Sequence, residues 1–279
     1  MKTYLVLDAF NIIHRSAAQK NIAGFRNSIG IPTGHFFGLF RMVLSLKQKC
    51  QATDLIVAWD SNPQWKRDLF PGYKASRNHS IVPGQVDIRT EGRHFLESLN
   101  ATHLWCEGEE CDDVMATFVK QLPPFGVNCF ISTTDRDLWQ LIPKATIIGK
   151  DVVTSEMVRE EFKVEPRCIP LYKSLYGDAS DELPKVPRLK WDDVQDAVKL
   201  SGGDIAKFWD LTITCCKPEI ISKLQEYKTQ IDINYKLAKL KTDLPLKITK
   251  TTPNKDQMLQ WINFYECNSL LPKVDELLN

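Results

Sequence analysis

Apolar residues along the first half of the chain follow two spacings in turn, and this alternation predicts a fold of strands and helices. Short, nearly unbroken apolar runs are typical of buried strands, and two of them lie at Thr3–Leu7 and Asp54–Trp59. Between them, residues such as Phe36 and Phe40 repeat at helical spacing, which predicts a helix over His35–Lys49. Because strands that alternate with helices are usually parallel, we expect a parallel sheet covered by helices.

The same alternation continues to about residue 150. The further predicted strands are Ala101–Trp105, Val127–Thr133 and Thr146–Gly149. The further predicted helices are Arg89–Leu99, Asp112–Leu122 and Asp137–Leu141. After residue 167 the pattern turns helical, with candidate helices at Leu171–Tyr176, Trp191–Leu200 and Pro218–Tyr227. We therefore expect an α/β domain over residues 1–167 and a helical subdomain, with a segment returning to the sheet, over residues 168–279.

Composition excludes several classes of protein. The chain has 279 residues, 43% of them hydrophobic and 25% charged, which is typical of a folded globular protein and not of a disordered one. No apolar run approaches the ~18–20 residues of a membrane-spanning helix. The N-terminus has no signal-peptide pattern, so we expect a cytoplasmic protein that does not contact membranes. Eight cysteines without a CxxC pair, and five scattered histidines, indicate reduced thiols and no zinc site.

Acidic residues follow four successive predicted strands, at the point where each strand ends. Ligands of open parallel sheets bind at the carboxyl ends of the strands, so these acids should meet at one edge. The acids concerned are Asp8, Asp60, Glu110, Asp112, Asp113, Asp135 and Asp137. Helix capping explains single members of the set, because acids stabilise the first turn of a helix, but it does not explain acids at every strand end.

Crowded carboxylates repel one another unless cations join them. The cation that suits an all-oxygen site is Mg²⁺. A pair of such ions is suited to hydrolysis of phosphodiesters, because one ion activates water and the other stabilises the leaving oxygen. The segment Asn62–Pro83 is basic, aromatic and too long for a simple crossover, and such a segment is either functional or a solvated loop.

Three acidic motifs in this order resemble those of the 5′ nucleases, a family that includes bacteriophage flap endonucleases and 5′-3′ exonucleases and the 5′-nuclease domain of bacterial DNA polymerase I. The motifs are Glu110-x-Asp112-Asp113, Asp135-x-Asp137 and Gly177-Asp178-x-x-Asp181. The resemblance also covers Leu5–Arg15, Ile56–Arg77, Tyr176–Pro184, Asn234–Leu246 and Asn268–Leu271, and so nearly the whole chain. No polymerase domain follows, so the chain resembles the stand-alone bacteriophage type, and host cytoplasm is then its expected location.

The resemblance implies a PIN-like parallel sheet, a helical arch over residues 62–95 and a helix-turn-helix-type subdomain that grips duplex DNA. It implies two Mg²⁺ ions, with Mn²⁺ as an alternative. The implied ligands of the first ion are Asp8, Asp60, Glu110 and Asp112, with Asp113 in support, and those of the second are Asp135, Asp137, Asp178 and Asp181. With these nine acids masked by metal, the rest of the chain carries ten more basic than acidic residues, which suits a polyanionic partner.

The implied arch carries basic and aromatic residues that meet the nucleic acid. They are Trp65, Lys66, Arg67, Tyr73, Lys74 and Arg77. Tyr73 is expected to stack on a base, and Lys74 and Arg77 to stabilise charge on the scissile phosphate from one helical face, so that Lys74, Arg77 and Asp113 are the expected catalytic residues. The family usually has arginine where this chain has Lys66, and lysine makes no bidentate phosphate contact.

The duplex-gripping turn departs from the family pattern. The family continues as Pro-Gly-Val-x-Gly-Ile-Gly, whereas this chain reads Pro184 to Lys190 with Lys185, Arg188 and Lys190 in place of the three glycines. Those glycines let backbone amides approach a phosphate and shape a monovalent-cation site in relatives. We therefore expect a grip by side-chain charge that is weaker or more sensitive to salt, and the substitutions argue against a bound K⁺.

The resemblance implies a metal-dependent, structure-specific 5′ nuclease. It is expected to cut 5′ flaps or 5′ ends of DNA, and RNA primers paired to DNA, near duplex junctions during replication. A single-strand binding protein is a further candidate partner without support from a particular residue, and a monomer is expected from the family alone. Two alternatives stay open: a PIN-like ribonuclease, and a catalytically weak protein that binds branched DNA.

Overall fold

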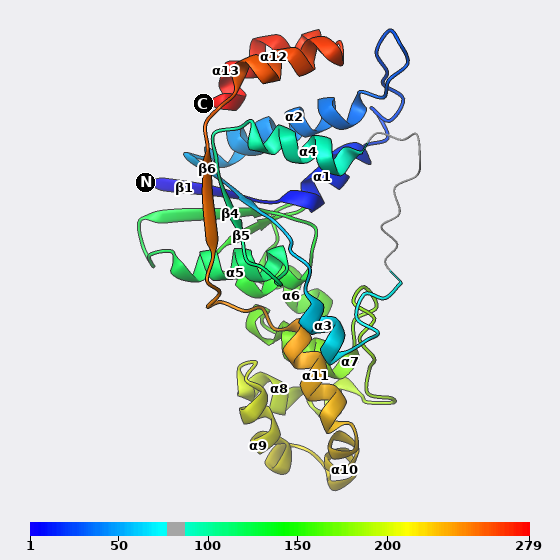
Figure 1. Ribbon diagram of the computed structural model, residues 1–279. Coiled ribbons are helices and arrows are strands. Elements are labelled where there is room, and N and C mark those ends of the chain that lie inside the picture. Colours follow the sequence, from blue (N-terminus) through cyan, green and yellow to red (C-terminus); the bar gives the residue numbers. More distant parts are fainter. Residues whose placement is uncertain (77–86) are drawn as a thin grey trace.

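A six-stranded sheet forms the centre of the half of the molecule that holds both chain ends (Figure 1). The computed structural model describes residues 1–76 and 87–279. The strands lie in the order β5-β4-β1-β2-β3-β6. Their bounds are β1 Lys2–Asp8, β2 Asp54–Ala58, β3 Ala101–Trp105, β4 Val127–Ser132, β5 Thr146–Ile148 and β6 Lys247–Thr251.

The first five strands are parallel, which confirms the predicted strands and their direction. The predicted parallel sheet has one addition that the sequence did not indicate: at one edge β6 runs antiparallel to β3, so the sheet is mixed. Strand β6 reads Lys-Ile-Thr-Lys-Thr and is almost entirely exposed, so it has no apolar run by which it could be found in the sequence. An edge strand rich in lysine also discourages further pairing with another chain.

The register of β1 brings the ends of three strands to one edge. Leu5, Val6 and Leu7 are completely buried in the middle of the sheet. Asp8 pairs with Ala58 of β2, and Leu7 pairs with Ser132 of β4. The residues that follow these three strands therefore start from neighbouring positions.

Helices cover both faces of the sheet (Figure 1). The helices on one face are α1 Ala9–Ala17, α2 Gly34–Cys50 and α4 Ile88–Glu97, with α12 Lys255–Phe264, η4 Asn268–Lys273 and α13 Val274–Leu278 beside them. The elements on the other face are α5 Cys111–Gln121, η1 Asp137–Leu141 and α6 Ser155–Phe162. Successive residues of β1 point to opposite faces, so Leu5 and Leu7 lie in the first core and Val6 lies in the second.

The other half of the molecule is helical (Figure 1). Its elements are α3 Gln64–Leu69, η2 Pro166–Cys168, α7 Ile169–Tyr176, η3 Trp191–Asp193, α8 Gln195–Ser201, α9 Ile205–Cys215, α10 Pro218–Glu226 and α11 Lys228–Ala238. One buried cluster contains Val6 of the sheet together with Leu175 and Phe208 of this half, so the helical part packs on the sheet as predicted. Among the described residues, every helix is too short or too polar to cross a membrane.

The structure can be compared with two further expectations, which concern the cysteines and the arch. The eight cysteines are all free thiols in the structure, and six of them are buried. The arch expected over residues 62–95 begins with α3 and ends in α4, but residues 77–86, including Arg77, lie outside the described residues. The division of the chain at residue 167 stays a prediction.

Candidate active site

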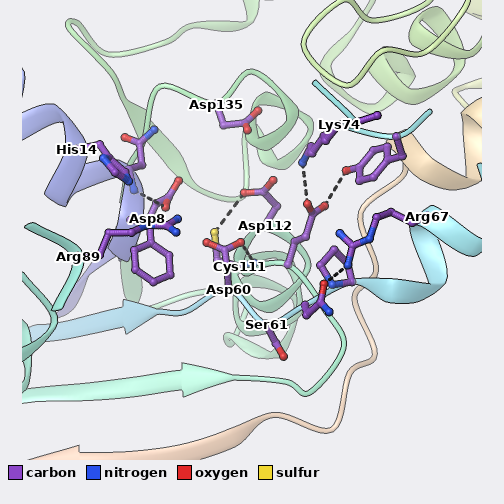
Figure 2. A pocket seen from close by; sticks show the side chains of 17 residues that line it. Asp8, His14, Asp60, Ser61, Arg67, Lys74, Arg89, Cys111, Asp112 and Asp135 are labelled. Atoms are coloured by element: carbon purple, nitrogen blue, oxygen red, sulfur yellow. Dashed lines mark hydrogen bonds and ion pairs between the residues drawn. The ribbon is translucent and has the colours of Figure 1, made fainter. Parts of the chain in front are cut away.

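A cavity of about 720 Å³ opens at the carboxyl ends of the central strands. Figure 2 shows acids from several strand ends pointing into it, with Lys74 and Arg67 on one side and Arg89 and His14 on the other. The acids that line the cavity are Asp8, Asp60, Glu110, Asp112 and Asp135. The structure thus brings together five of the nine acids that the sequence singled out.

Four of these acids, which we call the strand-end group, are Asp8, Asp60, Asp112 and Asp135. Among the described residues, the hydrogen bonds that the group accepts come from neutral donors. Asp8 accepts hydrogen bonds from the Asn11 amide (3.1 Å) and the Thr133 hydroxyl (3.0 Å). Asp60 accepts one from the Cys111 amide (3.1 Å). Within residues 1–76 and 87–279, no lysine or arginine forms an ion pair with any member of the group.

Two members of the group, Asp8 and Asp112, have raised pKa values. Burial raises the pKa of Asp8 to about 7, and the nearby charge of Asp60 adds to the effect. Burial also raises the pKa of Asp112 well above its usual value, with further contributions from Asp135 and Asp8. Crowded carboxylates of this kind resist ionisation until a cation joins them. Ionising Asp8 and Asp112 in this cavity therefore costs free energy that a bound cation would offset.

A second cluster, which we call the lysine-paired group, consists of Asp137, Asp178 and Asp181. One carboxylate oxygen from each lies within 4.8 Å of the others. The Lys173 ammonium donates to both Asp137 and Asp178. The Lys74 ammonium lies 3.5 Å from an oxygen of Asp181.

Lys173 affects its two partners unequally. Burial raises the pKa of Asp137 to about 7 despite the ion pair, because Asp135 and Asp181 also lie near it. Burial opposes ionisation of Asp178 as well, but there the Lys173 ammonium outweighs it and lowers the pKa. Asp178 is the less buried of the two, which explains the difference.

The loop that carries Asp178 and Asp181 depends on Gly177. This residue has φ +75°, and a Cβ atom there would lie 2.5 Å from the Leu183 carbonyl oxygen. Leu183 and Asp178 exchange backbone hydrogen bonds of 2.8 and 3.0 Å. A side chain at position 177 would therefore disturb the turn that presents both acids.

Glu110 is neutralised from within the protein. Its two oxygens accept hydrogen bonds from the Lys66 ammonium (2.6 Å), the Lys74 ammonium (2.7 Å) and the Tyr73 hydroxyl (2.8 Å). Burial opposes its ionisation, but the two lysines outweigh burial and lower its pKa to about 2. Glu110 is thus ionised and fully engaged by its neighbours.

These contacts bear on the DNA contacts expected of Lys66, Tyr73 and Lys74. Lys66 is 4% exposed and Tyr73 is 2% exposed, so in this structure neither side chain is free to contact DNA as the sequence suggested. The physical reason is that a buried carboxylate requires buried partners, and Glu110 and Asp113 occupy Lys66. Lys74 lines the cavity, as expected of a residue that meets the scissile phosphate.

Asp113 lies behind the cavity and does not line it. It is 1% exposed, and its oxygens lie 2.7 Å from the Lys241 amide and 3.1 Å from the Lys66 ammonium. The latter contact is an ion pair without hydrogen-bond geometry. These contacts tie α5 to the segment that returns toward the sheet. Its expected catalytic role stays a prediction, but its contacts here are structural.

The remaining residues expected to bind DNA lie at two places. Trp65 donates to Glu109 (3.0 Å), and the guanidinium of Arg67 is held by Asn62 at the cavity. Three basic side chains are exposed on the turn between α7 and η3, namely Lys185, Arg188 and Lys190. Arg188 adopts φ +55°, a conformation that favours glycine, so the turn keeps a glycine-like backbone although the glycine is gone.

Several residues of the cavity were missed in the sequence. Asn11 and His14 lie on the first turns of α1, whose start Asp8 caps, so helical spacing after Asp8 was an available signal. Cys111 lies within the Glu110 motif, where burial raises its thiol pKa well above the usual value. Arg89 and Phe10 had no signal, because only the tertiary fold brings α4 beside α1.

The strand-end group fits a divalent cation. Its carboxylate oxygens are the ligands that hard ions such as Mg²⁺ and Mn²⁺ take. The raised pKa values of Asp8 and Asp112 show that their ionisation is costly, and a bound cation would offset that cost. The lysine-paired group has similar donors, but there Lys173 already supplies a positive charge.

Comparison with solved structures shows the fold. T5 5′-exonuclease matches with a TM-score of 0.63 at 16% identity, over 85% of this chain and 88% of that one. Its zinc-bound form matches with a TM-score of 0.60. The catalytic core of Rad2 in complex with DNA substrate matches with a TM-score of 0.54 at 14% identity, over 95% of this chain and 88% of that one. The fold is therefore the PIN-like α/β architecture that the sequence predicted.

Comparison of sequences identifies the family. A 5′-3′ exonuclease of Aquifex aeolicus is 28% identical, over 99% of this chain and 96% of its own length. Flap endonuclease Xni of Shewanella halifaxensis is 27% identical, over 89% of this chain and 96% of its own length. DNA polymerase I of Pseudomonas aeruginosa is 29% identical over 90% of this chain, which spans only 29% of that polymerase. Residues 3–164 match the family model of the 5′-3′ exonuclease N-terminal resolvase-like domain, and the chain therefore belongs to this 5′-3′ exonuclease family.

Proposed function

We propose that this protein is a metal-dependent 5′ nuclease that cuts 5′ flaps and 5′ ends of DNA near duplex junctions. The strand-end group carries the proposal, because its four carboxylates line one cavity and form no ion pair with a lysine or arginine among the described residues. Lys74, at the same cavity, offers a cation to a phosphate. The names of the relatives agree, since they include a 5′-3′ exonuclease and a flap endonuclease.

We assign two Mg²⁺ ions, with Mn²⁺ as a substitute and no role for K⁺. The strand-end group holds the first ion and the lysine-paired group holds the second. These sets differ in two ways from those that the family resemblance implied. Asp135 moves from the second set to the first, because it lines the cavity with Asp8. Glu110 leaves the first set, because Lys66, Lys74 and Tyr73 already donate to its oxygens. When bound, the ions supply an activated water and stabilise the leaving oxygen of the phosphodiester.

The chain's own residues orient the substrate. Lys74 exchanges its contact with Glu110 for a contact with the scissile phosphate and stabilises the charge that develops there. Glu110 retains Lys66 and Tyr73 as partners, so it stays paired when Lys74 moves. Asp113 acts as a positioning residue that fixes Lys66 and the Lys241 backbone. Arg77, which the described residues do not include, keeps its expected role beside Lys74.

The duplex beyond the junction is held by Lys185, Arg188 and Lys190. Their exposure on one turn suits charge contacts with phosphates, which lose affinity as salt rises. Reversing the three charges should weaken duplex affinity at least tenfold and flatten its salt dependence. Fluorescence anisotropy of a labelled duplex at several salt concentrations measures both, with reversal of the exposed pair Lys199 and Lys207 as control. Unchanged affinity would refute this grip.

The cellular role that follows is removal of 5′ flaps and RNA primers at replication junctions. We infer a cytoplasmic monomer that acts on branched or 5′-flapped DNA and on primer hybrids, with a single-strand binding protein as a further candidate partner. This role rests on the family membership and the cavity together.

A substrate panel tests the proposed function. The protein is incubated in Mg²⁺ with an end-labelled 5′-flap duplex, a blunt duplex and a structureless RNA, and the products are resolved on a gel. Cutting of the flap near the junction, and loss of cutting in EDTA, is the expected result. Cutting of the RNA alone would instead identify a PIN-like ribonuclease. Flap binding without cutting, in both Mg²⁺ and Mn²⁺, would identify a branched-DNA-binding protein.

A further inference from the structure

The wall of the cavity opposite Lys74 is formed by an arginine stacked on an aromatic ring. The guanidinium carbon of Arg89, on α4, lies 4.4 Å from the centroid of the Phe10 ring, on α1. Phe10 packs edge-on against Trp59, with ring centroids 5.6 Å apart. Figure 2 shows Arg89 beside His14 and Asp8, across the cavity from Lys74. Arg89 is therefore seated on a rigid aromatic support.

Unlike the lysines of the site, Arg89 has no carboxylate partner among the described residues. Lys66, Lys74 and Lys173 each pair with two carboxylates. The Nε atom of Arg89 is buried and has no hydrogen-bond partner in residues 1–76 and 87–279. The pKa of Asp87, which caps α4, is lowered mainly by hydrogen bonds from Thr90. The charge of Arg89 contributes little to this shift.

An unpartnered buried donor on a charged group is costly, so such a group in a cavity points to a ligand. Stacking on Phe10 occupies one face of the guanidinium but leaves its edge donors available. Those donors form a planar fork that matches the oxygens of a phosphate. The cavity floor is made of carboxylates, yet Arg89 stays on Phe10 and forms no ion pair with Asp8 or Asp60 in the described residues.

We propose that Arg89 binds a phosphodiester of the strand that is cut, next to the scissile phosphate and on the opposite wall from Lys74. Phe10 is then a positioning residue that sets the plane of the guanidinium. The inference rests on the proposed function, because it needs a nucleic acid strand in the cavity. It adds a second phosphate contact, so that the strand is held on both sides of the strand-end group.

Arg93 provides a matched control on the same helix. Its guanidinium carbon lies 4.9 Å from the centroid of the Trp59 ring, so it too is stacked on an aromatic side chain. Its Nε atom, however, is paired with Glu97 at 2.9 Å, and its side chain is 56% exposed. Arg93 does not line the cavity. Replacing Arg93 therefore removes the same charge and the same kind of stacking without touching the proposed contact.

The first experiment compares the wild-type protein with Arg89→Ala, Arg89→Lys and Arg93→Ala. Affinity for a 5′-flap duplex is measured by anisotropy in EDTA at several salt concentrations, and thermal unfolding verifies that each variant folds. Arg89→Ala should weaken binding about tenfold or more and reduce the salt slope by about 1. Arg89→Lys should keep the slope but lose part of the affinity, because it keeps the charge without the fork. Arg93→Ala should bind like the wild-type protein.

The second experiment locates the contact. Single phosphates of the flap strand are replaced by neutral methylphosphonates, and 5′-hydroxyl and 5′-phosphate ends are compared. A methylphosphonate at one internal position next to the cut should weaken flap binding by the wild-type protein. The same substitution should not weaken binding by Arg89→Ala any further. If the affinity of the wild-type protein depends only on the 5′-terminal phosphate, the proposed internal contact is wrong. It is also wrong if each substitution lowers the affinity of the wild-type protein and of Arg89→Ala equally. Because binding is measured without metal, failure of the wild-type protein to cut would refute the proposed function and leave this result readable.

Discussion

The two acidic groups of the site are built from the same residue type but are neutralised differently. In the strand-end group, the hydrogen bonds that Asp8 and Asp60 accept from the described residues come from amides and a hydroxyl. In the lysine-paired group, Asp137 and Asp178 share the Lys173 ammonium. In the first group, Asp8 ends β1, Asp60 and Asp135 follow β2 and β4 by two or three residues, and Asp112 lies in the first turn of α5, whereas Asp178 and Asp181 lie on the turn after α7.

The presence of Lys173 in one group but not in the other indicates which metal site depends more on a bound cation. The strand-end group stores repulsion until a metal ion enters, so it should bind the ion tightly. An ion that enters the lysine-paired group must first displace Lys173, which lowers its net affinity. We therefore expect two classes of metal site in one active centre. The predictions below test this contrast, from the largest expected effect to the smallest.

Removing one strand-end carboxylate should abolish the chemistry. Asp8→Asn keeps the shape of the side chain but removes a charge from the group, so single-turnover cutting of a 5′ flap in Mg²⁺ should fall at least about a thousandfold. Flap affinity in EDTA should change little. The control is Asp54→Asn, because Asp54 pairs with Lys2 at the surface of β2, away from the cavity. A normal cutting rate in Asp8→Asn would refute the metal assignment.

Lys74 links Glu110 to the lysine-paired group, since it pairs with Glu110 and lies near Asp181. Lys74→Ala should slow single-turnover cutting about a hundredfold, because a phosphate loses a preorganised cation. Its flap affinity should fall much less. Rapid-quench kinetics measure the rate, and anisotropy measures the affinity. If the rate is unchanged and only affinity falls, Lys74 binds DNA without taking part in the chemistry.

Lys173→Met should destabilise the metal-free protein. It leaves Asp137 and Asp178 buried without their cation, which costs about 3–5 kcal/mol in the free energy of unfolding. Asp8→Asn should instead raise the free energy of unfolding in EDTA, because it removes repulsion between carboxylates. Urea unfolding in EDTA and in Mg²⁺ measures both variants, and Mg²⁺ should restore more stability to Lys173→Met than to wild type. Equal effects of metal on both proteins would show that Lys173 does not compete with it.

The pH dependence of stability follows from the raised pKa values. Asp8 and Asp137 have pKa values of about 7 in the folded protein, against 3.8 as the usual value. The folded state therefore binds protons more tightly, so the free energy of unfolding should rise as pH falls from 8 to 5.5. The lowered pKa of Glu110, about 2, acts only below this window. Urea unfolding in EDTA should show a rise of at least about 2 kcal/mol, and saturating Mg²⁺ should flatten it. A flat profile in EDTA would contradict the stored repulsion.

Much of the fold and part of the site could be predicted from local patterns. The parallel strands and the position of Asp8, Asp60 and Asp135 followed from apolar runs that end in acids. Asp178 and Asp181 lie in a helical half with no such pattern, so only the family resemblance pointed to them. The antiparallel strand β6 was missed because its exposed residues carry no apolar run.

The partners of the acids could not be predicted, because they depend on distant segments. Lys66 meets Glu110 across 44 positions, and Lys173 meets Asp137 across 36. A basic residue in a motif has the same letter whether it faces DNA or a buried carboxylate. Only the folded structure therefore shows that Lys66 is buried and that Arg89 stacks on Phe10 of another helix.

The most direct test of the contrast between the two groups is a calorimetric titration of Mn²⁺ into the metal-free protein. We predict two sites of different affinity in the wild-type protein. Asp8→Asn should lose the tighter site and keep the weaker one, whereas Lys173→Met should bring the two affinities closer together. Two equal sites in the wild-type protein, or loss of the weaker site in Asp8→Asn, would contradict the assignment of the strand-end group as the centre that requires the metal.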